Sequence, residues 1–265
     1  MIKHDLTAEN YFSFENNLKY MSASQFKNFL KCEASALAEL QGRYIREITD
    51  SLLTGSFVDA HFEGTLDIFK AQHKDIFTQK GELKSQYRHA EYMIQRVERD
   101  EKFMQYMSGE KQKIFTGEIA GVPFKIKVDS LHSNCIVDLK CMKNFELIWN
   151  SEKKRKEHFI THWGYHYQGA IYSEIIRQNT GKTLPFYIAA VSKEKPEPKL
   201  KLYWIPDDVL DDALREVISL APRFQKIKSG DLIPQRCNDC NYCRFTEVLE
   251  KPVNFLEECE VYDVE

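Results

Sequence analysis

Hydrophobic and polar residues alternate with a period of two along two neighbouring segments in the middle of the chain. Residues 122–129 place valine, isoleucine and phenylalanine on one face of a strand, and two lysines and Asp129 on the other. Residues 135–140 place Asp138 and Lys140 opposite an apolar face. Because a short run of turn-forming residues separates the segments, the pattern predicts a hairpin that can bring Asp129 near Asp138 and Lys140 on one polar face.

The rest of the chain alternates between helical and extended patterns. Ser22 and Gln25 have the spacing of a capping box, so we expect a helix to begin there. It contains Cys32 and ends near Gly42. Further helices are expected at about 51–62, 85–107, 145–156, 163–178 and 207–228, and further strands at about 113–120, 186–191 and 199–204.

This order of elements predicts an α/β fold. Helices come first, followed by a three-stranded meander, a crossover helix and more strands, which gives a central mixed sheet flanked by helices. The sequence contains no internal repeat and no low-complexity linker. We therefore expect one domain over residues 1–265, with a cysteine-containing tail over about residues 230–265.

Composition limits the classes of partner. Hydrophobic residues make up 43% and charged residues 29% of the chain, as in an ordinary globular protein. The net charge is −3, so a nucleic-acid site would have to be a local basic groove. No apolar run approaches the length of a membrane span and the N-terminus lacks a signal-peptide pattern, so we expect a cytoplasmic protein without a membrane partner.

The polar face of the hairpin has two interpretations. Two carboxylates and an ammonium group are costly to hold together unless a cation lies between the acids. Asp129, Asp138 and Lys140 could therefore form a catalytic site. They could equally belong to a solvated sheet face, because Asp-x-Lys is common by chance.

One of the expected helices, residues 163–178, also carries polar groups on one face. Tyr165, Gln168 and Tyr172 are spaced i, i+3 and i+7 and lie next to an apolar stripe. The periodicity alone favours an aromatic-rich core helix. The alternative is that Gln168 and Tyr172 face a phosphate backbone or Lys140.

Together these motifs resemble the PD-(D/E)XK nuclease superfamily, in its RecB-like branch, and within it the phage and prophage exonucleases of the RecE (exodeoxyribonuclease VIII) type. That branch has a His in an early helix, a Glu and an Asp on the first two core strands, Asp/Glu-x-Lys on the third, and Gln-x-x-x-Tyr in the next helix. The matching positions here are, in order, His61, Glu118, Asp129, Asp138-Leu139-Lys140 and Gln168-x-x-x-Tyr172. The similarity covers about residues 20–245.

The resemblance implies a restriction-endonuclease-like core and a DNA exonuclease that depends on Mg²⁺ or Mn²⁺. Asp129 and Asp138 would hold the ion, with the Leu139 carbonyl as a third ligand. Lys140 would orient or deprotonate the attacking water. His61 would be a further metal ligand or a phosphate contact, and Glu118 an outer ligand.

The resemblance also implies partners. The substrate would be linear duplex DNA ends, processed in phage-type recombination without ATP, with Tyr165, Gln168 and Tyr172 at the DNA. A homo-oligomer or a single-strand annealing partner would fit this role. The alternative function is a catalytically inactive DNA-binding protein on the same fold, and a third is a metal-cluster protein whose tail matters more than the hairpin.

Basic residues supply a candidate DNA channel. The run at residues 153–156, with Lys125, Lys127 and Lys143, could line it by phosphate contact, or could be a solvated face. Gly181-Lys182-Thr183 does not form a P-loop, because Ile176 stands where the first glycine belongs and a helix precedes the tripeptide. The sequence therefore predicts no ATP-driven motor.

A second candidate site lies in the tail. Cys237, Cys240 and Cys243 have C-x₂-C-x₂-C spacing, which suits a metal or cluster better than disulfides. Cys32 or Cys259 would be the fourth ligand. Some RecB-like nucleases carry an iron–sulfur staple made by one early and three late cysteines, and the chain resembles that layout except for its shorter last spacing. A [4Fe–4S] cluster is the preferred occupant, and Zn²⁺ or no ion are the alternatives.

Two other cysteines have no expected ligand role. Cys135 and Cys141 alternate with the apolar residues of the second strand, so we expect them to be packing residues.

Overall fold

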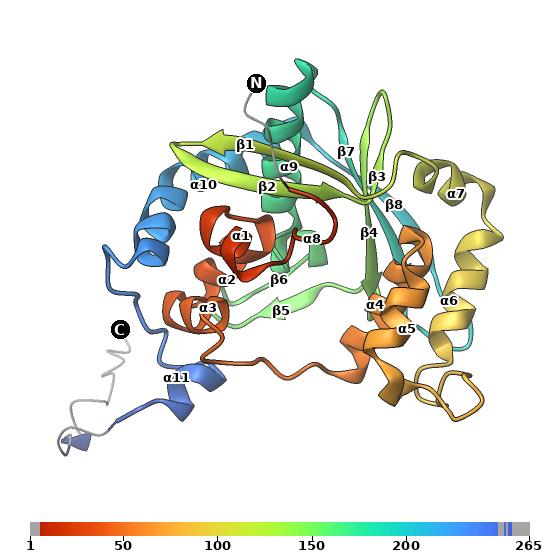
Figure 1. The fold of residues 1–265 in the computed structure, drawn as a ribbon, viewed down its shortest axis with the longest axis horizontal. Helices are drawn as coiled ribbons and strands as arrows, with labels where there is room; N and C mark the ends of the chain where they lie inside the picture. The colour runs from red at the N-terminus through yellow and green to blue at the C-terminus, as the bar shows by residue number, and fades with distance from the viewer. Residues whose placement is uncertain (1–5, 249–251, 253, 256–265) are drawn as a thin grey trace, which may run out of the picture.

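The computed structural model describes residues 6–248, 252, 254 and 255. A mixed sheet lies at its centre (Figure 1). Its central pair is parallel and both outer pairs are antiparallel. The strands are, in spatial order, β3 (Ser130–Leu131), β4 (Ile136–Met142), β7 (Phe186–Ser192) and β8 (Leu200–Ile205). This is the α/β arrangement that the sequence predicts.

A long hairpin precedes this sheet and leads into it. It consists of β1 (Lys113–Ile119) and β2 (Val122–Val128), which pair in antiparallel register. The turn is Ala120-Gly121, and both residues have positive φ, as a two-residue hairpin turn requires. β2 runs through Asp129 directly into β3, which pairs with β4. Because β1 and β2 form a separate two-stranded sheet, the expected three-stranded meander is present only in part.

The alternation of side chains along β4 separates two hydrophobic cores. Ile136 and Met142 belong to a core shared with α2 (Ala23–Lys31), α9 (Tyr165–Thr180) and α10 (Asp207–Ser229). Val137 and Leu139 belong to a core on the opposite face, shared with α4 (Asp50–Glu63), α6 (His89–Glu98) and α7 (Glu101–Met107). The sheet is therefore covered on both faces, and the polar residues Asp138 and Lys140 lie in the middle of β4 on its α9-facing side.

The first predicted helix is two helices. Ser22 caps α2 (Ala23–Lys31) by accepting the Gln25 N–H at 3.2 Å, as expected. Cys32 then adopts an extended conformation and its sulfur caps α3 (Glu33–Leu40). The predicted helix at 85–107 is divided in the same way, because Asp100 caps α7 through the Phe103 N–H.

The predicted helix at 145–156 is wrong. The chain forms instead a small hairpin of β5 (Ile148–Asn150) and β6 (Arg155–Glu157). Asn150 accepts the Lys153 N–H at 3.0 Å through its side chain, and its amide donates to Glu157 at 2.8 Å. These local side-chain bonds stabilise a turn at the expense of a helix.

Short elements complete the described chain. They are α1 (Phe14–Lys19), α5 (Leu66–Gln72), the 3₁₀ turn η1 (Lys74–Ile76), α8 (Phe159–His162) and α11 (Asn241–Phe245). Within the part of the chain described, none of the helices has the length and apolar character needed to cross a membrane.

Candidate active site

The structure brings three of the predicted residues together where β2, β3 and β4 meet. Asp129 lies at the junction of β2 and β3, and its Oδ2 accepts the Leu139 N–H of β4 at 3.0 Å. Asp138 and Lys140 follow one another on the polar side of β4, and their side chains form an ion pair. Asp138 is almost fully buried. The two carboxylates and the ammonium group therefore share one face, as the hairpin pattern predicts.

Helix α9 fixes this group from one side. The Gln168 amide donates to Asp138 Oδ1 at 2.7 Å, and both groups are buried. Tyr172 donates its hydroxyl hydrogen to the Lys127 carbonyl of β2 at 3.1 Å. Gln168 and Tyr172 thus fasten α9 to the two strands, and both also line the cavity that contains Asp129 and Asp138.

Helix α4 contributes from the other side two acids that the sequence interpretation missed. Asp59 and Glu63, spaced i and i+4, line the same cavity as Asp129 and Asp138. The cavity has a volume of about 440 Å³. The sequence does contain a signal for these two acids, because they are four residues apart and therefore share one face of a helix. Many surface helices carry such pairs, so the spacing alone does not indicate a site.

Burial and mutual repulsion set the protonation behaviour of these groups. Burial, reinforced by the neighbouring Asp138 carboxylate, holds the pKa of Asp129 well above its usual range. Burial also raises the pKa of Asp59 to about 7, although the Lys140 ammonium opposes the shift. Burial acts against the Lys140 ammonium, but Asp138 more than compensates, so the pKa of Lys140 is raised above its ordinary value. Crowded acids of this kind favour a bound cation.

Comparisons with known proteins agree with this geometry. A family model described as a PDDEXK-like domain of unknown function (DUF3799) matches residues 22–246. The chain belongs to this family. The chain therefore has the restriction-endonuclease-like fold of the PD-(D/E)XK superfamily, as the resemblance in the sequence implies.

The chain is similar to a crystal structure from Eubacterium rectale described as a "Putative exonuclease", with 45% identity and a TM-score of 0.89 over 96% of this chain and 98% of that one. With the family match, this similarity identifies the chain as a nuclease. The structure of SSO0001 matches with 13% identity and a TM-score of 0.34 over 84% of this chain and 94% of that one, which is too distant to carry an argument. No curated protein matches the chain.

The donor atoms around the cavity of this PDDEXK-like protein fit a hard divalent ion. Carboxylates of Asp59, Asp129 and Asp138 are available, with the Leu139 carbonyl next to them. Mg²⁺ and Mn²⁺ prefer oxygen ligands of this kind. Sulfur and imidazole ligands are absent among the described residues that line the cavity, so the site is suited to these ions and not to zinc.

Two predicted site residues lie elsewhere. His61 is also on α4, but two positions from Asp59 on a helix lie on opposite sides. Its Nε2 is 2.8 Å from Glu98 Oε1 of α6, and it does not line the cavity. Glu118 pairs with Pro123 near the turn of the β1–β2 hairpin, five residues or roughly 17 Å along the strand from the end that leads to Asp129. The structure therefore does not bring His61 or Glu118 to the carboxylates.

Lys125 also differs from the expectation of a DNA-facing lysine. It is 1% exposed, and its ammonium group donates to Asn17 Oδ1 at 2.7 Å and to the Tyr11 carbonyl. Its role in the structure is to fasten the N-terminal segment to β2. Both Lys125 and Lys127 line the cavity, but Lys125 is held by these contacts.

The cysteines form a separate group. Cys32 meets Cys237, Cys240 and Cys243 at the junction of α2 and α3, while Cys259 lies outside the described residues. Cys135 is buried among the residues of the α4-side core and Cys141 is half-buried against it, so their prediction as packing residues is confirmed.

Proposed function

We propose that this nuclease is a Mg²⁺-dependent deoxyribonuclease that hydrolyses phosphodiester bonds at DNA ends. The observation that supports this most strongly is the juxtaposition of Asp129, Asp138 and Lys140 in one cavity, with Asp59 facing them. Mn²⁺ would serve in place of Mg²⁺, because it accepts the same oxygen ligands.

The residues of the chain have separate roles in this proposal. A bound ion would supply a hydroxide near neutral pH and neutralise charge on the phosphate. The Leu139 N–H orients the carboxylate of Asp129, and the Gln168 amide orients that of Asp138. Lys140, paired with Asp138, would position the attacking water or the phosphate, or take a proton from that water, and would offset developing negative charge.

A basic groove next to the cavity supports DNA as the substrate. It has a volume of about 790 Å³ and shares Ser24 and Asn28 of α2 with the cavity. Only one acid, Glu146, lies among the described residues that line it. Five basic side chains line it, namely Lys27, Lys31, Arg46, Lys143 and Lys193. We take this groove, and not the run at 153–156, as the path of the phosphate backbone.

The charges in this groove are crowded. Burial, reinforced by Lys140, lowers the pKa of Lys27 to about 7. Lys27 lies over the Tyr165 ring at 4.7 Å from its centroid, and Lys31 lies over the Trp163 ring at 5.2 Å. Phosphates would relieve the repulsion among these cations, and the exposed Trp163 ring offers a surface on which a base can stack. We therefore keep Tyr165 as a proposed residue of the DNA-binding groove, where its ring contacts Lys27.

Action at ends is supported by the similar Eubacterium rectale protein, which is described as an exonuclease. Duplex substrates, phage-type recombination, and a homo-oligomer or annealing partner follow from the RecE-type resemblance alone. The alternative, an inactive DNA-binding protein on the same fold, is disfavoured because Asp129, Asp138 and Lys140 are present and adjacent.

The test uses the full-length protein and two DNA substrates of equal sequence, one linear duplex and one covalently closed circle. With Mg²⁺ we expect nucleotides to be released from the linear form and not from the circle, and EDTA should stop the release. Lys140→Met should lose release while still binding DNA. Cleavage of the circle would contradict action at ends, and binding without release in wild type would favour the inactive DNA-binding alternative.

A further inference from the structure

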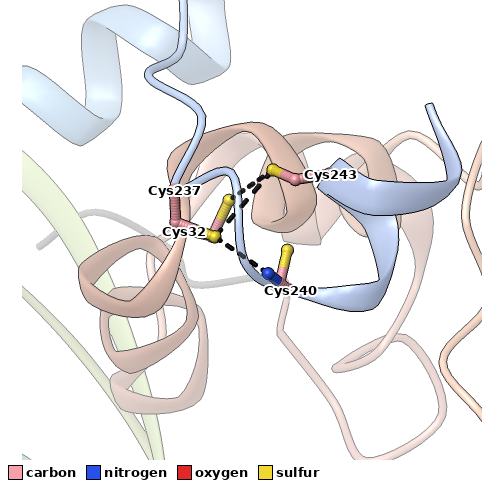
Figure 2. Close-up of side chains that lie close together, drawn as sticks. All are labelled: Cys32, Cys237, Cys240 and Cys243. Carbon is pink, nitrogen blue, oxygen red and sulfur yellow. Dashed lines mark hydrogen bonds between the residues drawn. The ribbon is translucent and has the colours of Figure 1, made fainter. Parts of the chain in front are cut away.

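Four cysteine sulfurs from the two ends of the chain converge on one point. Sγ of Cys32 is 3.6 Å from Sγ of Cys243, and Sγ of Cys237 is 3.9 Å from the same atom. All four ligand sulfurs, including that of Cys240, lie within 4.8 Å of one another (Figure 2). The cysteines are free, so the group is not a pair of disulfides.

These distances discriminate between the two occupants that the sequence leaves open. Four thiolates around one zinc ion, with Zn–S of about 2.3 Å and tetrahedral angles, lie about 3.8 Å from one another. In a [4Fe–4S] cluster each cysteine binds a different iron atom at the corner of a cube, so the four sulfurs must lie much farther apart. The observed spacing is closer to that around a single zinc ion than to that around the cluster.

The sequence spacing is compatible with either occupant, because C-x₂-C-x₂-C is also the spacing of bacterial [4Fe–4S] ferredoxins. C-x₂-C-x₂-C places Cys240 and Cys243 within one turn, and α11 (Asn241–Phe245) begins directly after Cys240. A last spacing of only two residues keeps the third tail sulfur close to the other two. This is the feature by which the chain departs from the iron–sulfur staples that it otherwise resembles.

Neighbouring groups are arranged as around metal-bound thiolates. The Cys240 N–H points to Cys237 Sγ at 3.3 Å, and the Ser35 N–H points to Cys32 Sγ at 3.5 Å. Cys32 and Cys243 are buried, so two of the four ligands are already withdrawn from solvent.

We propose that Cys32, Cys237, Cys240 and Cys243 bind one structural zinc ion in place of an iron–sulfur cluster, and that this ion fastens the C-terminal tail to the junction of α2 and α3. Four protein ligands leave no open position, so the site is structural and not catalytic.

A zinc ion at these cysteines would also hold the end of α2 that forms part of the wall of the basic groove. Lys31, which lines that groove, immediately precedes Cys32. Next to the zinc site, the Ala34 N–H donates to the Gln235 carbonyl at 3.0 Å, and the Gln235 N–H donates to Glu33 at 2.7 Å. Glu33 also pairs with Arg223 of α10 through two hydrogen bonds. The described part of the tail is thus held by hydrogen bonds on one side of the ion, and losing the ion would leave α3 and the tail joined by these hydrogen bonds.

The test is the metal content of full-length protein, purified without oxygen from cells grown with added iron and again with added zinc. We expect about one zinc per chain in both preparations, no acid-labile sulfide and no brown colour. Metal-free protein given Co²⁺ should show the absorption of a tetrahedral thiolate site. Iron with sulfide in the iron-grown protein would overturn the proposal, and so would protein that holds no metal in either preparation.

Matched variants separate this site from the nuclease site. Cys240→Ser should lose the zinc, while Cys135→Ser and Asp138→Asn should retain it. Cys240→Ser should also become sensitive to trypsin at Arg236 and Arg244, with a melting temperature lower by on the order of 10 °C. Zinc that survives Cys240→Ser but is lost in Asp138→Asn would place the ion at the carboxylates and refute the proposal, without bearing on nuclease activity.

Discussion

The carboxylate cavity and the cysteine cluster are both suited to metal ions but are built in opposite ways. The cavity gathers oxygen donors from α4 and the centre of the sheet, leaves about 440 Å³ open to a substrate, and adjoins a basic groove. The cluster gathers four sulfurs from α2–α3 and the tail, with two of them buried. Oxygen ligands beside open space suit a catalytic metal ion, because a substrate can reach it. Four sulfur ligands without an open position suit a structural metal ion.

The two regions meet at α2. Ser24 and Asn28 of α2 line both the cavity and the groove, and Cys32 ends the same helix. Phe26 and Phe29 pack α2 against Phe224 of α10. One helix therefore connects the carboxylate cavity with the cysteine cluster. Substitutions in one site at a time separate their contributions.

The largest effect is expected for Asp138→Asn. It removes a central carboxylate while keeping the amide contact with Gln168, so the fold should persist. Loss of several kcal/mol of transition-state stabilisation should reduce nucleotide release by about 10³-fold or more in Mg²⁺. Asp211→Asn, an exposed position on α10, is the matched control and should keep wild-type activity. A residual activity above a tenth of wild type would remove Asp138 from the site.

A smaller effect should distinguish Asp59 from His61 on the same helix. Asp59→Asn weakens the set of oxygen donors, so about tenfold more Mg²⁺ should be needed for half-maximal activity. His61→Ala removes a contact with Glu98 outside the cavity, so its Mg²⁺ dependence should be unchanged. Titration of activity with Mg²⁺ compares the two. A higher Mg²⁺ requirement in His61→Ala and an unchanged one in Asp59→Asn would instead make His61 the metal ligand, as the sequence resemblance implies.

The basic groove should contribute to binding and not to chemistry. Lys31→Gln should weaken DNA affinity several-fold and reduce the slope of log K against log salt by about one, because one phosphate contact is lost. Lys182→Gln, exposed at the end of α9, is the control and should leave the slope unchanged. Equal slopes for both variants and wild type would place the DNA elsewhere.

The smallest effect concerns stability and pH. Since burial raises the pKa of Asp59 to about 7, the metal-free folded protein binds a proton that the unfolded chain releases at about pH 4. Stability from this group is complete below pH 4 and is lost as pH rises through 7. The melting temperature of metal-free protein should therefore fall between pH 5 and pH 8 by on the order of 5 °C more in wild type than in Asp59→Asn. An equal fall in melting temperature in the wild type and in Asp59→Asn would contradict this role of Asp59.

Local patterns were enough to predict most of the fold and the centre of the cavity. The period of two gave the hairpin and the shared face of Asp129, Asp138 and Lys140, and the helical period gave α4, α9 and α10. The segment at 145–156 was predicted wrongly, because hydrogen bonds of Asn150 and Glu157 outweigh its helical propensity. The break at Cys32 depends on a contact with the tail that no local pattern contains.

The remaining site residues depend on packing between distant elements. Asp59 enters the cavity because α4 crosses β4, and His61 leaves it because the same helix turns that side towards Glu98. Gln168 and Tyr172 were placed on one face correctly, but only the packing of α9 against the strands shows that this face is turned inward. The basic groove likewise combines residues from α2, the loop before α4, and the ends of β4 and β7.

The central claim is that Asp129 and Asp138, with Asp59 facing them, hold a divalent cation beside Lys140. The most direct measurement is an anomalous difference map from a crystal of the protein soaked in Mn²⁺. Our account predicts a manganese peak bonded to oxygens of Asp129 and Asp138 and absent in a crystal of Asp138→Asn. A map with no manganese between these two carboxylates, or with the ion at His61 instead, would contradict it.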